Sequence, residues 1–151
     1  MFKRFLLTLT PLFVGLISSF YTSDNISTWY VGIEKSELTP PNWIFGPVWT
    51  VLFLMMGVAL SLVATKSSPY KKTAEILFGA QLTLNFAWSF LFFEFHLLGW
   101  ALLEIVLLWA FIFMTIVYFH KVSKLAAYLL VPYLLWVSFA TYLTFMVWKL
   151  N

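Results

Sequence analysis

Five long apolar stretches, separated by short connectors that hold most of the charge, constrain this chain more than any other feature. They run over residues 5–22, 44–65, 75–93, 98–119 and 125–148. At 1.5 Å rise per residue, a helix of about 22 residues covers about 33 Å, enough for a bilayer hydrocarbon core of about 30 Å. The sequence therefore predicts an all-α membrane protein, a bundle of five transmembrane helices, folded as one domain over residues 1–151.

The composition agrees with a chain that is covered by lipid. Hydrophobic residues make up 62% of the 151 residues and charged residues only 10%. A soluble domain of this size cannot hide so much apolar surface. The formal charge of +3 does not indicate nucleic acid, because the Lys and Arg residues lie in connectors and near the termini rather than on one face. The predicted partner is the lipid membrane.

The distribution of basic residues predicts the orientation. One side carries Lys3, Arg4, Lys66, Lys71, Lys72, Lys121 and Lys124, whereas the other carries Lys35 and Lys149. The positive-inside rule then places the N-terminus in the cytoplasm and the C-terminus outside.

The first stretch has an alternative interpretation as a signal peptide, because Lys3 and Arg4 precede it. Against this, Phe20 and Tyr21 follow Ser19, where a cleavage site needs small residues. We therefore expect this stretch to stay as a membrane helix.

The longest connector, residues 23–43, lies on the predicted outer side. Its Pro40-Pro41 pair restricts the backbone and favours extended structure, which indicates a packed segment. Two interpretations stay open, an outer lid over a binding site and a simple tether.

The third stretch carries Gln81, Asn85 and Trp88, whose spacing of four and three residues places them on one helical face. Amide side chains in lipid need partners inside the bundle, so this face is predicted to point inward. The same pattern suits a purely structural role in which the amides join helices.

Two further helices carry aromatic residues on one face. Tyr133, Trp136 and Ala140 share a face of the fifth stretch, and Phe53 follows Trp49 by four residues in the second. Interfacial tryptophans usually lie near the headgroups, which does not account for a residue as deep as Trp136.

Depths calculated from the predicted orientation bring these groups together. Trp49 and Trp88 lie about 8 Å below the outer ends of their helices. Asn85 lies at about 12 Å and Trp136 at about 18 Å. Aromatic and amide groups from three helices are thus expected in the outer half, where they form a cavity for a large, flat, mostly apolar ligand.

The remaining polar residues do not form a recognisable reaction centre. Apart from Glu75 at the first position of the third stretch, Glu104 is the one acid in a predicted span, and both a functional and a structural role are open for it. His96 and His120 lie in connectors on opposite sides, too far apart to bind one metal ion. We predict no metal site and no cofactor.

Three motifs in this order carry a resemblance to a known family. They are Pro40-Pro41-x-Trp43-x-Phe45-x-Pro47-x-Trp49, Leu84-Asn85-Phe86-Ala87-Trp88-Ser89-x-x-Phe92-Phe93, and Pro132-Tyr133-x-x-Trp136-x-x-Phe139-Ala140. With the five-span layout, the chain resembles the TspO/MBR family, the tryptophan-rich sensory proteins and translocator proteins, over roughly residues 5–151.

The resemblance implies a membrane protein that binds porphyrins, including protoporphyrin IX, and isoquinoline-type ligands under its first loop. Carried over by position, the ligand-binding residues are Tyr30, Pro40, Trp49, Phe53, Asn85, Trp88, Trp136 and Ala140. It also implies a sensor or transporter in a bacterial inner membrane, rather than in the mitochondrial outer membrane. One departure argues against cholesterol transport, because six residues separate Tyr142 from Lys149 where the animal pattern allows at most five.

Two other functions stay open. In one, Trp49 and Trp136 act as catalytic residues in a light- and oxygen-dependent breakdown of bound porphyrin; no hydrolase or transferase motif is present. In the other, the protein is a scaffold or channel whose aromatics only pack. The small residues Gly79, Thr83 and Ala87 follow one another at intervals of four and predict a homodimer contact.

Overall fold

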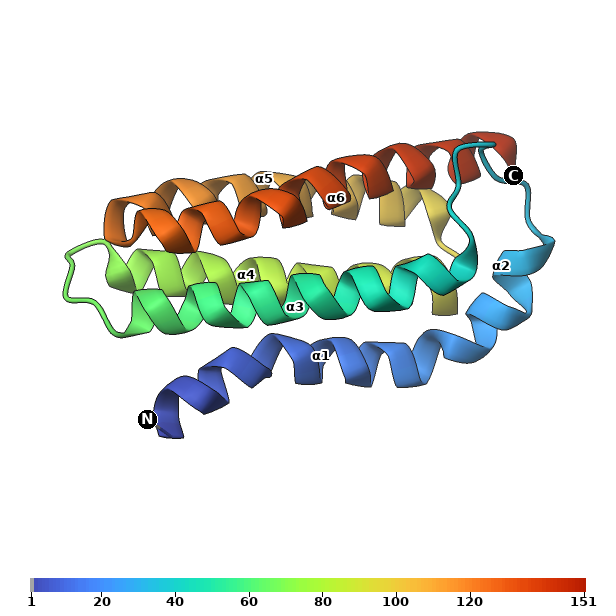
Figure 1. Ribbon diagram of the computed structural model, residues 1–151. Coiled ribbons are helices and arrows are strands. Elements are labelled where there is room, and N and C mark those ends of the chain that lie inside the picture. Colours follow the sequence, from blue (N-terminus) through green and yellow to red (C-terminus); the bar gives the residue numbers. More distant parts are fainter. Residues whose placement is uncertain (1) are drawn as a thin grey trace.

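The computed structural model describes residues 2–151, with side chains from Leu6 onward, as a bundle of long helices (Figure 1). The helices are α1 (Phe2–Ser27), α2 (Trp29–Gly32), α3 (Asn42–Ala64), α4 (Lys71–Ser89), the π-helix η1 (Phe90–Glu94), α5 (Leu98–Val122) and α6 (Lys124–Leu150). Five spans, one of them α4 with η1, are long and apolar enough to cross a membrane. This confirms the predicted all-α bundle of five transmembrane helices.

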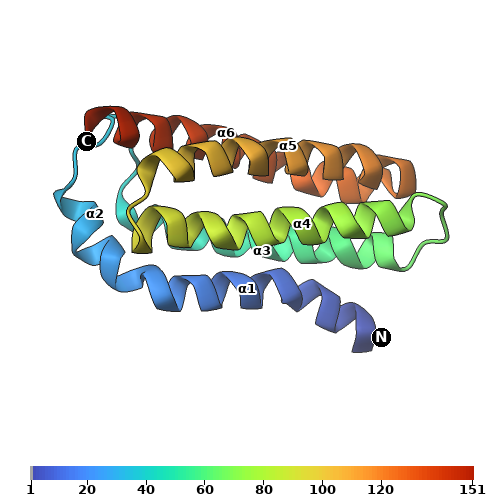
Figure 2. The same cartoon turned by 180° about the vertical axis from the view of Figure 1, so that it is seen from behind.

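The helices pack as neighbours in a simple order. α1 lies along α3, α3 lies beside α4 and α6, and α5 packs between α4 and α6 (Figures 1 and 2). The N-terminus and the connectors α3–α4 and α5–α6 lie at one end of the bundle, and α2 and the C-terminus lie at the other. We call this second end the α2 end. Lys3 and Arg4, used in the orientation prediction, fall where the structure describes no side chains.

A glycine sets how closely the first helix approaches the rest of the bundle. A Cβ atom at Gly57 of α3 would collide with the backbone carbonyl of Thr8 in α1. The two backbones therefore meet here without a side chain between them, as is common between helices in membranes. This contact fixes α1 against α3 in the half of the bundle away from α2.

The segment expected as a loop over residues 23–43 is largely helical at its start. α1 continues to Ser27, and α2 follows at Trp29. The hydroxyl residues here bond to the backbone of the preceding turn. Ser27 Oγ donates to the carbonyl of Asp24 at 3.0 Å, and Thr28 Oγ1, directly after α1, donates to the same oxygen at 2.7 Å. Such back-bonding lets hydroxyl residues continue a helix.

The end of α4 departs from regular α-helical winding. Phe90–Glu94 forms a π-helix, in which Phe95 N donates to the carbonyl of Phe90 at 2.8 Å. π-Helical turns are rare and occur frequently at functional sites. Here the turn carries Phe92, which is buried, toward the interior at the α2 end.

Candidate functional site

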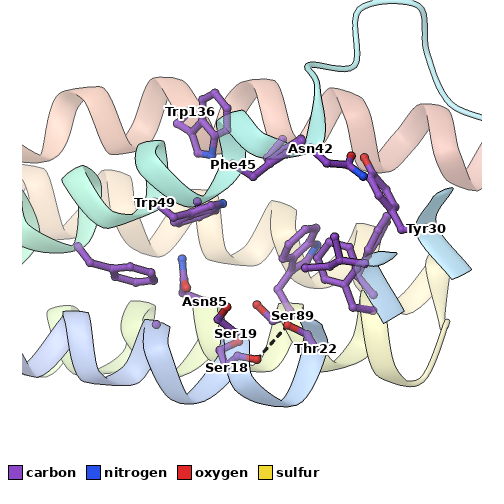
Figure 3. Close-up of a pocket in the computed structure, with 18 of the residues that line it drawn as sticks. Ser18, Ser19, Thr22, Tyr30, Asn42, Phe45, Trp49, Asn85, Ser89 and Trp136 are labelled. Atoms are coloured by element: carbon purple, nitrogen blue, oxygen red, sulfur yellow. Dashed lines mark hydrogen bonds between the residues drawn. The ribbon is translucent and has the colours of Figure 1, made fainter. Parts of the chain in front are cut away.

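A cavity of about 280 Å³ lies in the bundle, bounded by α1, α2, α3, α4, η1 and α6 (Figure 3). Its size is near the lower limit of ligand pockets, about 300–1,000 Å³. Six elements from the beginning, the middle and the end of the chain meet around it. The lining residues are Leu12, Gly15, Leu16, Ser18, Ser19, Thr22, Ile26, Tyr30, Asn42, Phe45, Gly46, Trp49, Thr50, Phe53, Asn85, Trp88, Ser89, Phe92, Phe93, Trp136, Ala140, Leu143, Thr144 and Val147.

Aromatic side chains from α3 and α6 form one wall of this cavity. The rings of Trp49 and Phe53 lie 5.5 Å apart, and those of Phe45 and Trp136 lie 6.0 Å apart with their edges and faces in contact. Figure 3 shows Trp136, Phe45 and Trp49 on the same side of the cavity. Rings that support one another in this way offer flat apolar surface at little cost in side-chain freedom.

A second group of rings lies nearer to α2. Trp88 of α4 stacks on Phe92 of η1 with centroids 5.1 Å apart. Tyr30 of α2 packs against both Phe92 and Phe93, at 6.1 and 5.5 Å. The π-helix therefore supplies the rings on which the buried tyrosine of α2 rests.

One hydrogen-bond chain joins α4 to α6 beneath the aromatic wall. Asn85 Nδ2 donates to the hydroxyl of Tyr133 at 2.9 Å, and that hydroxyl donates to Gln81 Oε1 at 2.8 Å. All three side chains are buried. The prediction that the face of Gln81 and Asn85 points inward is thus confirmed, and the amides join helices while Asn85 also lines the cavity.

Seven of the eight residues carried over from the resemblance line this one cavity. They are Tyr30, Trp49, Phe53, Asn85, Trp88, Trp136 and Ala140. Pro40 does not line it, and Asn42 is the first residue after α2 to reach the cavity. Whether the seven residues contact a ligand stays a prediction.

The sequence interpretation missed the contribution of α1. Ser18, Ser19 and Thr22 line the cavity on the side opposite the aromatic wall, together with Ser89 of α4 (Figure 3). The spacing of Ser18 and Thr22 by four residues in an apolar helix was the available signal. That signal is weak, because hydroxyl residues in membrane helices usually bond to their own backbone.

The cavity wall is uncharged over the part of the chain that the structure describes. The lining includes hydroxyl, amide and indole groups but no Lys, Arg, His, Asp or Glu side chain. Glu104 of α5 does not line it; both carboxyl oxygens are buried, and no hydrogen-bond partner for them is found among the described residues. The indole nitrogens of Trp88 and Trp136 are likewise buried without a partner there.

The segment between α1 and α3 is fastened across the α2 end. Trp29 stacks on His96, with ring centroids 4.0 Å apart, and His96 has a φ of 53°, in the left-handed region. The backbone of Glu34 exchanges two hydrogen bonds with the side chain of Asn151, at 3.1 and 2.9 Å. Lys35 Nζ donates to the carbonyls of Tyr30 and Ile33 at 2.7 and 3.0 Å. Trp29 and Glu34 thus attach this segment to the bundle, and Lys35 ties its backbone together from within.

Comparison with known proteins assigns the chain to a family. A profile of the TspO/MBR family matches residues 7–149. The chain belongs to the TspO/MBR family. It is 46% identical to the tryptophan-rich protein TspO of Chlorobaculum tepidum, over 91% of this chain and 89% of that protein.

Two more relatives show the breadth of the TspO/MBR family. The tryptophan-rich protein TspO of Archaeoglobus fulgidus is 41% identical over 95% of this chain and 93% of its own length. The translocator protein of Homo sapiens is 37% identical over 95% of this chain and 87% of its own length. Family membership and the five spans together identify an integral membrane protein.

Proposed function

We propose that this TspO/MBR protein binds porphyrins, such as protoporphyrin IX, and isoquinoline-type ligands, and acts as a receptor, sensor or transporter for a flat, mostly apolar small molecule. The observation that carries the proposal is that Trp49 of α3, Trp88 of α4 and Trp136 of α6 line one uncharged cavity. Indole rings on three helices match the large apolar faces of a tetrapyrrole.

The test is a titration of the protein in detergent or nanodiscs with protoporphyrin IX, followed by absorbance and tryptophan fluorescence. Saturable binding is expected in the wild type, and the double variant Trp49→Phe with Trp136→Phe is expected to bind about tenfold or more weakly, because both indoles lose contact area. Trp100→Phe is the matched control, since Trp100 is 67% exposed and lies outside the cavity. Unchanged affinity in the double variant would contradict the proposal.

A second candidate function is a light- and oxygen-dependent breakdown of the bound porphyrin. It is favoured by the position of Trp49 and Trp136 in the same cavity, where both indoles would lie beside an excited ring. Dioxygen is the oxidant in this reaction, and the indoles serve as reactants or electron donors. Porphyrin bleaching under illumination that stops both without oxygen and in the double variant would support it; bleaching that persists in that variant would exclude these residues.

The remaining parts of the proposal concern placement and assembly. We place the protein in a bacterial inner membrane with its N-terminus in the cytoplasm, on the basis of the lysine-bearing connectors at the end opposite α2. We propose a homodimer through Gly79, Thr83 and Ala87 of α4, of which the first two are exposed and the third is half-buried. Crosslinking in lipid before and after Gly79→Leu would decide, because a large side chain would hold two such helices apart.

A further inference from the structure

We infer that Ser18 of α1 and Ser89 of α4 form a polar subsite that binds an uncharged hydrogen-bonding group, a hydroxyl or a carbonyl, on the edge of the planar ligand. The inference rests on the proposed function, since it assigns one edge of the guest in the same cavity. The observation behind it is that three serine hydroxyls around the cavity make no hydrogen bond within the described protein.

Hydroxyl residues in the spans generally bond to their own helix. Thr22, Thr50 and Thr144 line the cavity, yet each donates to the carbonyl four residues earlier, at 2.8 to 2.9 Å. Ser138 does the same at 2.8 Å, outside the cavity. This back-bonding is the usual way to satisfy a hydroxyl where water is absent.

Four serines depart from this pattern. Within the part of the chain whose side chains are described, no hydrogen bond is found for Ser18, Ser19, Ser61 or Ser89, and three of the four line the cavity. Ser18 is only 7% exposed, so its hydroxyl has little access to solvent outside the cavity. Its Oγ atom is not fully enclosed by protein, so the hydroxyl faces the cavity, where a bound molecule can supply the hydrogen bond that the bundle does not.

The arrangement of the cavity indicates which part of a ligand these hydroxyls would contact. Figure 3 shows Ser18 and Ser89 on the side opposite Phe45 and Trp136, so a flat guest that lies against the aromatic wall turns an edge toward the serines. A serine hydroxyl can donate or accept, which suits either a hydroxyl or a carbonyl group.

The lack of charged side chains in the cavity wall excludes charged groups from this subsite. An ionised carboxylate next to Ser18 would have no cationic side chain beside it, since none of the described residues that line the cavity is charged. Burial of an unpaired charge is far more costly than burial of a neutral group that makes a hydrogen bond. The subsite therefore takes a neutral substituent.

The experiment uses two porphyrins that differ only at the relevant edge. Hematoporphyrin IX carries hydroxyl groups where mesoporphyrin IX carries plain ethyl groups, and both have the same propionates. Dissociation constants for both are measured with the wild type, Ser18→Ala, Ser89→Ala and the control Ser61→Ala, whose half-buried serine is unbonded but outside the cavity. The readout is the preference for hematoporphyrin, expressed as the ratio of the two constants.

We expect the preference for hematoporphyrin to fall by about fivefold in Ser18→Ala and in Ser89→Ala, the value of one ordinary hydrogen bond, and to stay unchanged in Ser61→Ala. Thermal unfolding of ligand-free Ser18→Ala should occur at the same or a higher temperature, because the substitution removes a cavity-facing hydroxyl that makes no hydrogen bond within the described protein.

Each contrary outcome has a distinct meaning. Saturable binding of both porphyrins with the same preference in all variants overturns the subsite and leaves the proposed function intact. A lower unfolding temperature for ligand-free Ser18→Ala also overturns it, since the hydroxyl would then be satisfied within the protein. Absence of saturable binding of either porphyrin to the wild type overturns the proposed function and the subsite with it.

Discussion

The hydroxyl of Tyr133 donates a hydrogen bond of 2.8 Å to Oε1 of Gln81 and so joins α6 to α4 in the interior of the bundle. The same hydroxyl accepts from Asn85 Nδ2. Tyr133→Phe should lower the free energy of unfolding in detergent by about 1–3 kcal/mol, because it leaves two buried amide groups unpaired. Tyr142→Phe is the control, since it breaks only an exposed bond to Ser36. Equal unfolding temperatures for the two variants would contradict the assigned role.

The close approach of α1 and α3 predicts opposite effects of two identical substitutions. Gly57→Ala should destabilise the protein by about 1–3 kcal/mol, because the new methyl group meets the Thr8 carbonyl and α1 must move away. Gly32→Ala in α2 should be neutral or stabilising by up to about 1 kcal/mol, since its surroundings are open and alanine favours the helix. Thermal unfolding of both variants checks the pair, and a stable Gly57→Ala protein would rule out this contact.

The two hydrogen bonds between Glu34 and Asn151 predict an effect on ligand release. Asn151→Ala removes both and should raise the dissociation rate of bound porphyrin by about five- to tenfold, because the segment that carries Tyr30 loses one of its attachments. Stopped-flow displacement measures this rate, with Leu150→Ala, an exposed neighbour, as control. An unchanged rate would favour the interpretation of the segment as a tether over that of a lid.

Burial raises the pKa of Tyr30 in α2 above its ordinary value, because the phenolate would lose solvation. Below the unfolded pKa of about 10 the phenol is protonated in both states and contributes no pH dependence. As the pH rises further, the unfolded chain releases the proton and the folded one keeps it, so stability falls. The unfolding temperature should therefore drop more between pH 9 and about 11 in the wild type than in Tyr30→Phe. Parallel curves for the two proteins would show that the phenol is not buried.

The long apolar stretches made the bundle and most of the aromatic wall predictable, because helix length and the spacing of residues within one helix, such as Asn85 and Trp88, are local properties of the sequence. The prediction that the first helix ends at residue 22 was wrong, because α1 continues to Ser27. The hydroxyl residues at its end bond to the backbone of the preceding turn. The serines of α1 could not be assigned, since their significance depends on which hydroxyls stay unbonded after the fold forms. Pro40 was carried over by position, and only the path of the chain before Asn42 shows that it misses the cavity.

The absence of charged side chains from the cavity wall, among the residues described, also limits which molecules the proposed site would accept. Nucleotides and phosphorylated cofactors have flat aromatic rings that would fit against Trp49 and Trp136, but they carry phosphates that would lose their hydration without compensation. Discrimination against these abundant molecules thus needs no dedicated gate. The same rule applies to the propionates of a porphyrin, so in the proposed complex these charged groups are expected to face water rather than the cavity wall.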